Sequence, residues 1–347
     1  MSDNSDEKAL KPPAPSGGKR LLQNLALSLA TFFLCLAAFE IVLRLAGYGN
    51  LEIYQPDPKL YWKIKPNQDC FTKIDHKPVH INSHGTRGPD FQTRKPTNTI
   101  RILSLGDSIT YGWGLADNQT YSYRLQDLLQ EYVGNGGRVE VINAGVDAWS
   151  YPQMWVCFRD IGLKYKPDIV VLAAANLWTQ FSEQNSPKFV REFMWRVRLK
   201  NFLRHFAIYH YFVEVKLMKY YERYRTMFIP VNPNQDSLFE AEQRKHPYAL
   251  FRSAIENVCG LAQKNGVKPV LLHLPNADEL DATNTPVFSV KCEVHEKFGV
   301  PLVDMTPDVK LQGKAFYLNA DPVHFNARGN ELIARRLFET VTNLIKP

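Results

Sequence analysis

Two short motifs, far apart in the sequence, carry the side chains needed for acyl transfer. Ser108 stands in Gly-Asp-Ser-Ile-Thr, directly after the apolar run Ile100–Leu105, which predicts a buried strand. Asp321 and His324 belong to Asp-Pro-Val-His, ahead of a last helical pattern. A serine hydroxyl becomes a nucleophile when a histidine removes its proton and a carboxylate orients that histidine. Either motif alone is also ordinary turn chemistry, but together they predict a Ser-His-Asp triad.

Two further strand ends carry hydrogen-bond donors that could hold an oxyanion. Val139–Gly145 reads as a strand that ends on a glycine, and Asp168–Asn176 reads as a strand that ends on an asparagine. A glycine N–H and an asparagine amide are suitable donors for an oxyanion hole. A plain turn glycine and a helix cap are the alternative roles for these residues.

With these four pieces in order, the sequence resembles the GDSL/SGNH hydrolase family, which is named for a Ser, a Gly, an Asn and a His in separate blocks. The resemblance implies Ser108 as the nucleophile, with His324 as its base and Asp321 as the orienting carboxylate. It also implies an oxyanion hole built from Ser108, Gly145 and Asn176. Neither a metal nor an organic cofactor is implied.

The sequence departs from the family pattern in the third block. Where the family usually has Gly-x-Asn-Asp, this chain has Ala174-Ala175-Asn176-Leu177. The asparagine donor is kept, and the loop that positions it is altered. In the first block, Ile109 replaces the leucine of the family name, which is a conservative apolar change.

Strand and helix patterns alternate along the rest of the chain. Later strands are predicted at Val267–Leu274 and Val300–Val303. Helices are predicted near Asn118–Val133, Pro152–Tyr165, Pro247–Asn265, Pro286–Phe298 and Ala327–Ile345. This alternation predicts a three-layer α/β/α sandwich around a parallel, flavodoxin-like sheet of about five strands.

The N-terminal part of the chain differs in composition from the rest. Residues 1–20 are rich in Ser, Asp, Lys and Pro and predict a disordered tail. Residues 21–46 are long and apolar enough for a transmembrane anchor; a cleaved signal peptide or a buried core helix is the alternative. Basic residues before this span place the tail in the cytoplasm. The catalytic domain is then extracytoplasmic, on the periplasmic side of a bacterial inner membrane.

Residues 47–99 have the composition of loops and short strands, and we expect a linker or leader there. His76, His80 and His84 recur every four residues, but a proline and a glycine lie among them, which favours separate loop histidines over a metal site. Arg87 is expected in a structural salt bridge, with an anionic or sugar substrate as the alternative. Glu40 and Arg44, one helical turn apart, are expected to pair at the membrane exit.

Residues 100–347 form the predicted SGNH hydrolase-like domain, which residues 178–246 interrupt as a helical insertion. Residues at steps of three or four predict one apolar helix face: Phe202, Phe206, Tyr209, Val213, Leu217, Tyr220 and Tyr224. The same segment is rich in Lys and Arg. It is interpreted as a lid or membrane-surface helix, as a groove wall for an acidic glycan, or as a hairpin packed on the domain.

The overall composition is globular: 45% of the 347 residues are hydrophobic, 22% are charged, and the net charge is +7. No nucleic-acid motif accompanies the positive charge, so no nucleic-acid partner is expected. The five cysteines lack metal-ligand spacing. Cys157 and Cys259 fall in helical patterns, which favours buried free thiols.

The predicted function is that of a membrane-anchored serine esterase. Its substrate would be an O-acylated envelope carbohydrate or a lipid ester. One alternative is an O-acyltransferase in exopolysaccharide or cell-wall modification, with a membrane acyl-donor partner. Another is a non-catalytic glycan-binding or assembly module, against which the complete set Ser108, Asp321 and His324 argues.

Overall fold

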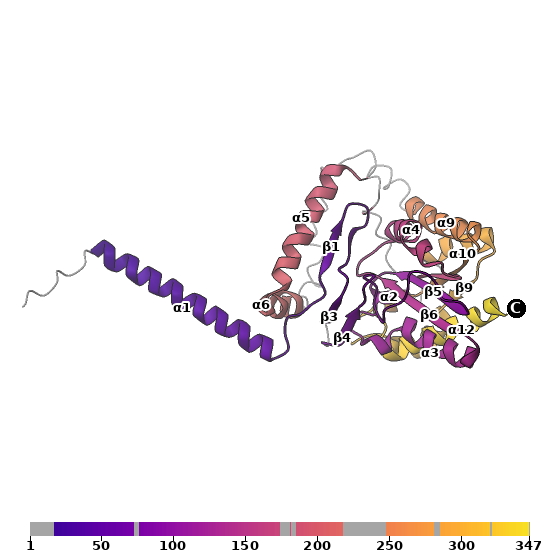
Figure 1. The fold of residues 1–347 in the computed structure, drawn as a ribbon, viewed down its shortest axis with the longest axis horizontal. Helices are drawn as coiled ribbons and strands as arrows, with labels where there is room; N and C mark the ends of the chain where they lie inside the picture. Colours follow the sequence, from indigo (N-terminus) through magenta and orange to yellow (C-terminus); the bar gives the residue numbers. More distant parts are fainter. Residues whose placement is uncertain are drawn as a thin grey trace, which may run out of the picture.

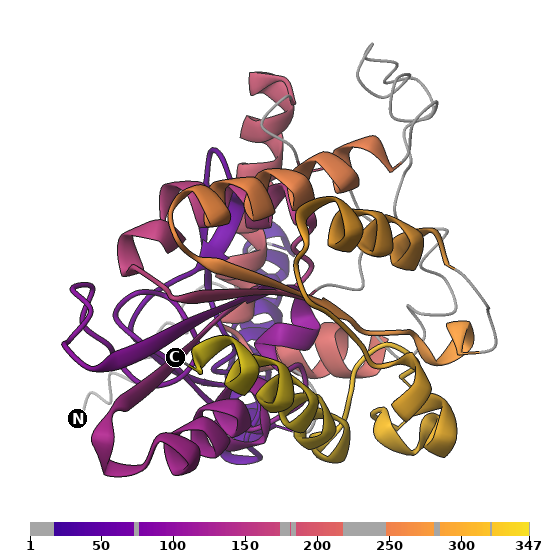
Figure 2. The same cartoon turned by 90° about the vertical axis from the view of Figure 1, so that its right-hand side faces the viewer.

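A parallel five-stranded sheet forms the centre of the molecule (Figures 1 and 2). The structure, a computed structural model, describes residues 17–72, 76–173, 181, 185–217, 248–280, 285–319 and 321–346. The strand order is β6-β5-β7-β8-β9, the predicted flavodoxin-like order. The strands are β5 (Thr99–Gly106), β6 (Arg138–Gly145), β7 (Ile169–Ala173), β8 (Lys268–His273) and β9 (Leu302–Asp304).

Side chains alternate between two cores, one on each face of the sheet. In β7, Val170 and Leu172 belong to one core, while Ile169 and Val171 belong to the other. This alternation is the period-two geometry of a strand that is buried on both faces. The first core is covered by α4 (Tyr151–Asp160), α9 (Ala249–Lys264) and α10 (Pro286–Phe298); the second is covered by α3 (Tyr121–Val133) and α12 (Ala327–Ile345). The predicted three-layer sandwich is therefore confirmed.

The helix predictions hold within a few residues, with two differences at helix ends. The helix expected over Pro152–Tyr165 ends at Asp160, and a 3-10 turn follows over Gly162–Tyr165. The helix expected from Asn118 begins at Tyr121, where Thr120 accepts a hydrogen bond from Tyr123 N. The remaining short elements are α2 (Ser108–Tyr111), α11 (Thr306–Gln312), and 3-10 turns over Asp117–Gln119, Gly134–Gly136, Ala277–Glu279 and Gly313–Phe316.

The leader contains short strands, as its composition indicates, and they pair in two antiparallel hairpins. In the first, β1 (Tyr54–Asp57) pairs with β2 (Tyr61–Ile64), and in the second, β3 (Gln68–Phe71) pairs with β4 (Pro78–Ile81). Their apolar residues join the core that faces α4 and α9. Trp62 Nε1 donates to Asp147 O at 3.0 Å, and Trp149 Nε1 donates to Trp62 O at 2.9 Å. The leader is thus fastened to the loop that follows β6.

One helix at the N-terminal end is long and apolar enough to cross a membrane. This helix, α1 (Gly17–Leu45), projects from the rest of the fold (Figure 1). Of the predicted tail, residues 1–16 lie outside the described residues. Residues 17–20 form the start of α1. The expected pair forms: Arg44 Nε donates to Glu40 Oε1 at 2.8 Å.

The insertion does not present one continuous helix face, so that prediction is wrong. Helix α5 (Pro187–Arg204) ends before Phe206, and α6 (Ala207–Tyr209) leads into a π-helix over His210–Leu217. The end of α5 shifts the angular positions of the residues that follow, so spacing alone no longer places them on one face. Tyr220 and Tyr224 lie outside the described residues, as does about half of the segment 178–246.

Candidate active site

The carboxyl end of β5 places Ser108 at the start of α2. Gly106 must be a glycine, because a Cβ there would stand 1.8 Å from Thr110 Oγ1 and 2.2 Å from Ala173 O. Asp107 is the N-cap, and its carboxylate accepts a hydrogen bond from Ile109 N at 2.9 Å. The sharp turn from strand to helix therefore sets the serine at the edge of the sheet where ligands of α/β folds bind.

The structure brings Ser108, His324 and Asp321 together as the two motifs predict. His324 Nε2 lies 2.8 Å from Ser108 Oγ, and His324 Nδ1 lies 2.6 Å from Asp321 Oδ2. Ser108 is buried, while the side chains of His324 and Asp321 keep 18% and 16% of their surface exposed. The three groups form one hydrogen-bonded chain that a small substrate can approach from solvent.

The partners of the imidazole fix its tautomer. An ionised carboxylate only accepts hydrogen bonds, so His324 Nδ1 carries the proton toward Asp321. His324 Nε2 is then free of a proton and accepts the hydroxyl hydrogen of Ser108. Burial by itself would raise the pKa of Asp321, but the hydrogen bond and charge of His324 and the N–H groups of Val323 and His324 hold that pKa below its ordinary value.

The loop that carries His324 is held by its own backbone and by the cap of α12. Asp321 Oδ1 accepts hydrogen bonds from Val323 N at 2.9 Å and His324 N at 3.0 Å. Leu318 N donates to His324 O at 2.8 Å. At the start of α12, Asn326 Oδ1 accepts from Arg328 N at 3.0 Å. The Asp-x-x-His spacing thus makes a turn in which the carboxylate both shapes the loop and faces the imidazole.

Gly145 ends β6 level with Gly106, and its position demands a glycine. A Cβ would stand 2.2 Å from Tyr111 N, so α2 approaches the strand end too closely for any side chain. Gly145 N donates to Asn143 Oδ1 at 3.0 Å, and Asn143 Nδ2 donates to Thr110 O at 2.8 Å. Asn143 therefore ties the backbone of α2 to the end of β6.

Asn176, the third predicted oxyanion donor, lies outside the described residues. The strand that leads to it is described as far as Ala173, whose carbonyl accepts from Thr110 Oγ1 at 3.2 Å. The end of β7 is therefore joined to α2 directly. The predicted role of Asn176 stays a prediction.

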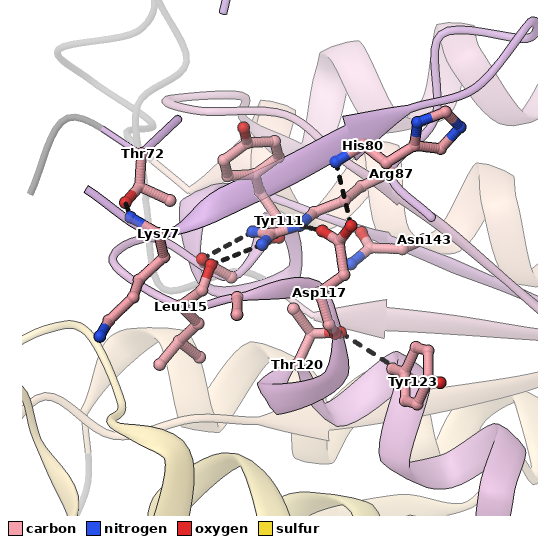
Figure 3. A network of polar contacts seen from close by, with 12 residues as sticks. Thr72, Lys77, His80, Arg87, Tyr111, Leu115, Asp117, Thr120, Tyr123 and Asn143 are labelled. Carbon is pink, nitrogen blue, oxygen red and sulfur yellow. Dashed lines mark hydrogen bonds and ion pairs between the residues drawn. The ribbon is translucent and has the colours of Figure 1, made fainter. Parts of the chain in front are cut away.

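Arg87 has a structural role, as the sequence favours, and Figure 3 shows its side chain reaching the loop after α2. Its guanidinium donates to Tyr111 O and Gly112 O at 2.8 Å and to Leu115 O at 2.5 Å. Arg87 Nε lies 2.6 Å from Asp117 Oδ1. These bonds satisfy the carbonyls at the C-terminal end of α2, so a leader residue fixes the short helix that carries Ser108.

One aromatic residue beside the triad was missed by the sequence reasoning. The indole of Trp113 stacks on the imidazole of His324, with ring centroids 5.4 Å apart and an interplanar angle of 20°. Trp113 immediately follows Gly112, the left-handed cap of α2. No local signal distinguishes it from an ordinary loop tryptophan, because its partner is distant in the sequence.

The three leader histidines do not form a metal site among the residues that the structure describes. His76 stacks on Phe71 at 4.0 Å, and His80 Nδ1 lies 2.7 Å from Asp69 Oδ1. His84 Nε2 lies 2.8 Å from Phe91 O. Each ring contacts a different partner. His76 and His84 lie in turns, as expected, whereas His80 belongs to β4, so the prediction of a loop is wrong for His80.

A cavity of about 280 Å³ lies at the outer edge of β6, away from the triad. Its wall includes Gln126 and Gln130, whose side-chain oxygens accept hydrogen bonds from Val141 N and Val139 N at 2.9 Å. These bonds occupy N–H groups that an edge strand would otherwise expose. The residues that line this cavity include none of Ser108, Asp321 and His324.

A comparison with known protein families matches the part of the chain that contains Ser108, Asp321 and His324. A family model described as GDSL-like Lipase/Acylhydrolase family matches residues 104–332. Similar solved structures include TesA (17% identity, TM-score 0.44, covering 71% of this chain and 99% of that one) and a lipase/acylhydrolase from Enterococcus faecalis (19%, 0.43, 72% and 98%). An acetyl xylan esterase, AlAXEase, is also similar (17%, 0.42, 70% and 100%). No curated protein matches the sequence.

Proposed function

This chain belongs to the GDSL-like lipase/acylhydrolase family and is a hydrolase of ester bonds, and from that premise we propose that Ser108, His324 and Asp321 are its catalytic triad. The observation that carries the proposal is the continuous path from Ser108 Oγ through the imidazole to Asp321 Oδ2, with both distances below 3 Å. Nucleophile, base and orienting carboxylate then have their required order.

The reaction proceeds by an acyl-enzyme. His324 Nε2 takes the proton of Ser108 Oγ as this oxygen attacks the ester carbonyl carbon. The tetrahedral intermediate collapses, the C–O bond of the ester breaks, and the leaving alcohol takes the proton from Nε2. Water then attacks the acyl carbon and gives a proton to His324 Nε2. The bond between this carbon and Ser108 Oγ breaks, His324 returns the proton to Ser108 Oγ, and the acid is released. Asp321 stabilises the imidazolium in both halves of the reaction.

The oxyanion is held, in this proposal, by the N–H of Ser108, the amide of Asn176 and the N–H of Gly145. Ser108 opens α2, where the first N–H groups have no partner within the helix. The Gly145 N–H points at Asn143 Oδ1, so it contributes when the substrate oxygen replaces or shares that acceptor. Loss of one such donor typically raises the barrier by about 3–4 kcal/mol.

We also propose that α1 stays on the protein as a membrane anchor, with the catalytic domain on the extracytoplasmic side. The end of α1 makes contacts with the folded domain that cleavage after residue 46 would remove. Glu40 accepts hydrogen bonds from Ala207 N and Ile208 N at 2.9 and 3.0 Å, and Leu43 is buried. Contacts of this kind are unexpected for a signal peptide, whose removal leaves the mature fold intact.

The proposed substrates are esters that reach the membrane surface: O-acyl groups on envelope carbohydrate, or lipid esters. The partly exposed His324 supports an acyl group presented from outside rather than one enclosed in the core. An anchor limits the enzyme to substrates near its own bilayer, which is the reason to prefer envelope components over soluble metabolites.

The experiment that tests the triad uses the full chain in detergent with 4-nitrophenyl acetate and a fluorescent alkylphosphonate that labels activated serines. Ser108→Ala is compared with Ser253→Ala, the same change at an exposed position on α9. We expect Ser108→Ala to lose labelling and at least about 10⁴-fold in kcat, and Ser253→Ala to retain both. Phosphonate labelling of Ser108→Ala at the wild-type rate would exclude Ser108 as the nucleophile.

A further inference from the structure

Helix α5 carries an exposed apolar stripe that the rest of the described fold leaves uncovered. Trp195 and Phe202 each have 61% of their surface exposed, and Leu199 lies between them at 43%. These residues are spaced four and three apart, so they share one face of the helix. The same side of the helix carries three exposed cations, Lys188, Arg191 and Arg198, and one exposed carboxylate, Glu192, so its net charge is positive. Large apolar side chains flanked by Lys and Arg are the composition of helices that lie in a membrane interface.

The opposite face of α5 explains why this stripe points outward. Phe193 packs against Trp62 and Tyr61 of β2, with ring centroids 5.3 and 5.8 Å apart. Arg204, the last residue of α5, is buried, and its Nη1 donates to Glu52 O at 2.6 Å. The leader therefore fixes the rotation of α5, and the Trp195–Phe202 stripe has no freedom to turn inward.

The C-terminal end of α5 is fastened to the point where α1 ends. Arg44 Nη2 donates to His205 O at 2.5 Å, directly after α5. The carboxylate of Glu40 accepts from the first two N–H groups of α6, and Gly49 N donates to His210 Nδ1 at 2.8 Å. Phe39 of α1 and Phe212 of the π-helix have ring centroids 6.0 Å apart. The C-terminal end of α1 is thus joined by these contacts to the end of α5, the helix that carries the stripe.

The arrangement of these elements suits a flat surface. In Figure 1, α5 runs crosswise to α1, and the sheet lies beyond α5 on the side away from α1. A helix that crosses the direction of a membrane span lies along the bilayer plane. Helix α2, which begins at Ser108, lies at the end of the sheet nearest to β1 and α5 (Figure 1). The reactive serine therefore belongs to the membrane-facing end of the sheet.

We propose that the Trp195–Phe202 face of α5 docks on the bilayer that holds α1, with its apolar residues at the acyl boundary and its cations on anionic lipid headgroups. This inference rests on the proposed role of α1 as an anchor. Two contacts hold the protein to the membrane, the span and the interfacial helix, and together they fix the tilt of the catalytic domain. The domain then presents its Ser108 edge to esters in, or attached to, the same leaflet.

The test places spin labels on the full chain in vesicles of phosphatidylcholine with or without phosphatidylglycerol. Cys35 and Cys292, the two cysteines that are not buried, are replaced by serine. A label is then attached at Phe202→Cys, at Leu29→Cys within α1, or at Leu311→Cys. Leu311 is the matched control, because it is an apolar residue with 85% of its surface exposed, on α11. Collisions with lipid-soluble oxygen and with a water-soluble nickel complex report where each label lies.

We expect the label at Phe202 to resemble that at Leu29, with severalfold more oxygen and severalfold fewer nickel collisions than at Leu311. If the label at Leu29 meets lipid while the label at Phe202 meets water, the docking proposal is wrong and the anchor stands. If the label at Leu29 meets water, the anchor itself is wrong and docking falls with it. Dipolar broadening between labels at Phe202 would place a second copy of the chain on the stripe, which also overturns the proposal.

A charge reversal tests the role assigned to the cations. The double change Arg191→Glu and Arg198→Glu should raise nickel collisions at Phe202 in vesicles that contain phosphatidylglycerol. It should have a smaller effect in phosphatidylcholine alone, because the lost attraction depends on lipid charge. Arg335→Glu, at an exposed position on α12, is the matched control. An equal response in both lipids would contradict headgroup binding.

Discussion

Two regions of the molecule are built in different ways. The catalytic edge is the edge of the sheet that carries the proposed triad, and the anchor face consists of the leader strands with α5 and α6, next to the proposed anchor α1. At the catalytic edge, each motif contains its own turn, and the sheet brings the motifs together: Ser108 follows β5, and the Asp321–His324 loop precedes α12. On the anchor face, no segment has a strong motif. Its structure comes from pairs such as Arg204 with Glu52, whose members are far apart in the sequence.

Buried cations show the same contrast. On the anchor face, the Arg204 guanidinium lies 3.7 Å from a Glu52 carboxylate oxygen and 5.1 Å from the centre of the Tyr54 ring. Near the catalytic edge, Lys291 is buried in α10, and its Nζ donates to Leu272 O at 3.0 Å. Arg204 has an adjacent carboxylate as its partner. For Lys291, burial disfavours the charged form and lowers the pKa. We therefore expect the Arg204–Glu52 pair to be costly to break by removing one partner, and the buried Lys291 to carry a stability cost of its own.

The largest effect should come from Asp321, the carboxylate of the proposed triad. Asp321→Asn can keep an oxygen on Val323 N and His324 N, but it presents an NH₂ group to His324 Nδ1. The imidazole then carries its proton on Nε2 and cannot accept one from Ser108. We expect kcat on 4-nitrophenyl acetate to fall by about 10⁴-fold with little change in structure. Asp127→Asn, at a half-exposed position on α3, is the control and should keep its activity.

The pH dependence of stability gives a second reading of the same variant. The pKa of Asp321 is lowered in the fold, so the unfolded chain binds more protons than the native one between the lowered value and the ordinary value of about 4. The stability due to this carboxylate is complete above the ordinary value and is lost as the pH falls through the lowered one. An unfolding difference between Asp321→Asn and wild type that stays constant across this range would contradict the assignment.

The contrast also explains what could be predicted from the sequence. Ser108, Asp321 and His324 could be found because glycine, aspartate and proline mark their turns, and because parallel strands bring their ends to one edge. The roles of Asn143 and Trp113 could not be found, since each depends on a partner from another segment. The end of α5 at Arg204 was missed because the spacing of apolar residues continues past it. Tertiary contacts end the helix there, and no helix-stop residue marks the position in the sequence.

The next largest effect is expected on the anchor face. Arg204→Met leaves Glu52 buried without its cation, and we expect the free energy of unfolding to fall by about 3–5 kcal/mol. Adding Glu52→Leu should recover most of that loss, because the second change removes the uncompensated charge. Urea unfolding of the full chain in detergent measures both. A double variant as unstable as Arg204→Met would show that packing, rather than charge, dominates at this site.

A smaller effect of opposite sign is expected near the catalytic edge. Burial lowers the pKa of Lys291 to about 7. The negative charges of Asp107, Asp304 and Glu279 act in the opposite direction and offset only part of this shift. The native state then binds fewer protons than the unfolded state from about pH 7 to about pH 10, so stability rises with pH over that range. Lys291→Met should be more stable than wild type at pH 7, by on the order of 1–3 kcal/mol. The gap should narrow as the pH rises from 7 toward 10, and it should close above the ordinary lysine pKa, where the amine is neutral in both states.

The same Lys291 variant separates a stability cost from a positioning role. If Lys291 only occupies space, Lys291→Met keeps kcat while it gains stability. If the lysine orients Asp107, the N-cap of α2, then kcat falls and the gain in stability accompanies a loss in activity. Arg336→Met, at a partly exposed position on α12, is the control for removing a cation elsewhere. A variant that is less stable than wild type at pH 7 would contradict the comparison of the two buried cations.

The smallest effect, and the one that compares the two regions most directly, is the order in which buried thiols react. Cys70 lies in the leader, while Cys157 and Cys259 lie in α4 and α9 of the sheet domain, and burial raises the pKa of each to about 12. At pH 8 only about one thiol in 10⁴ is ionised in the folded state, so labelling requires local opening. With Cys35 and Cys292 replaced by serine, mass spectrometry of labelled peptides gives three separate rates.

If the anchor face opens on its own, Cys70 reacts first, and Arg204→Met speeds its labelling while the rates at Cys157 and Cys259 stay unchanged. Equal rates at all three cysteines, rising together in Arg204→Met, would instead mean that the two regions unfold as one unit.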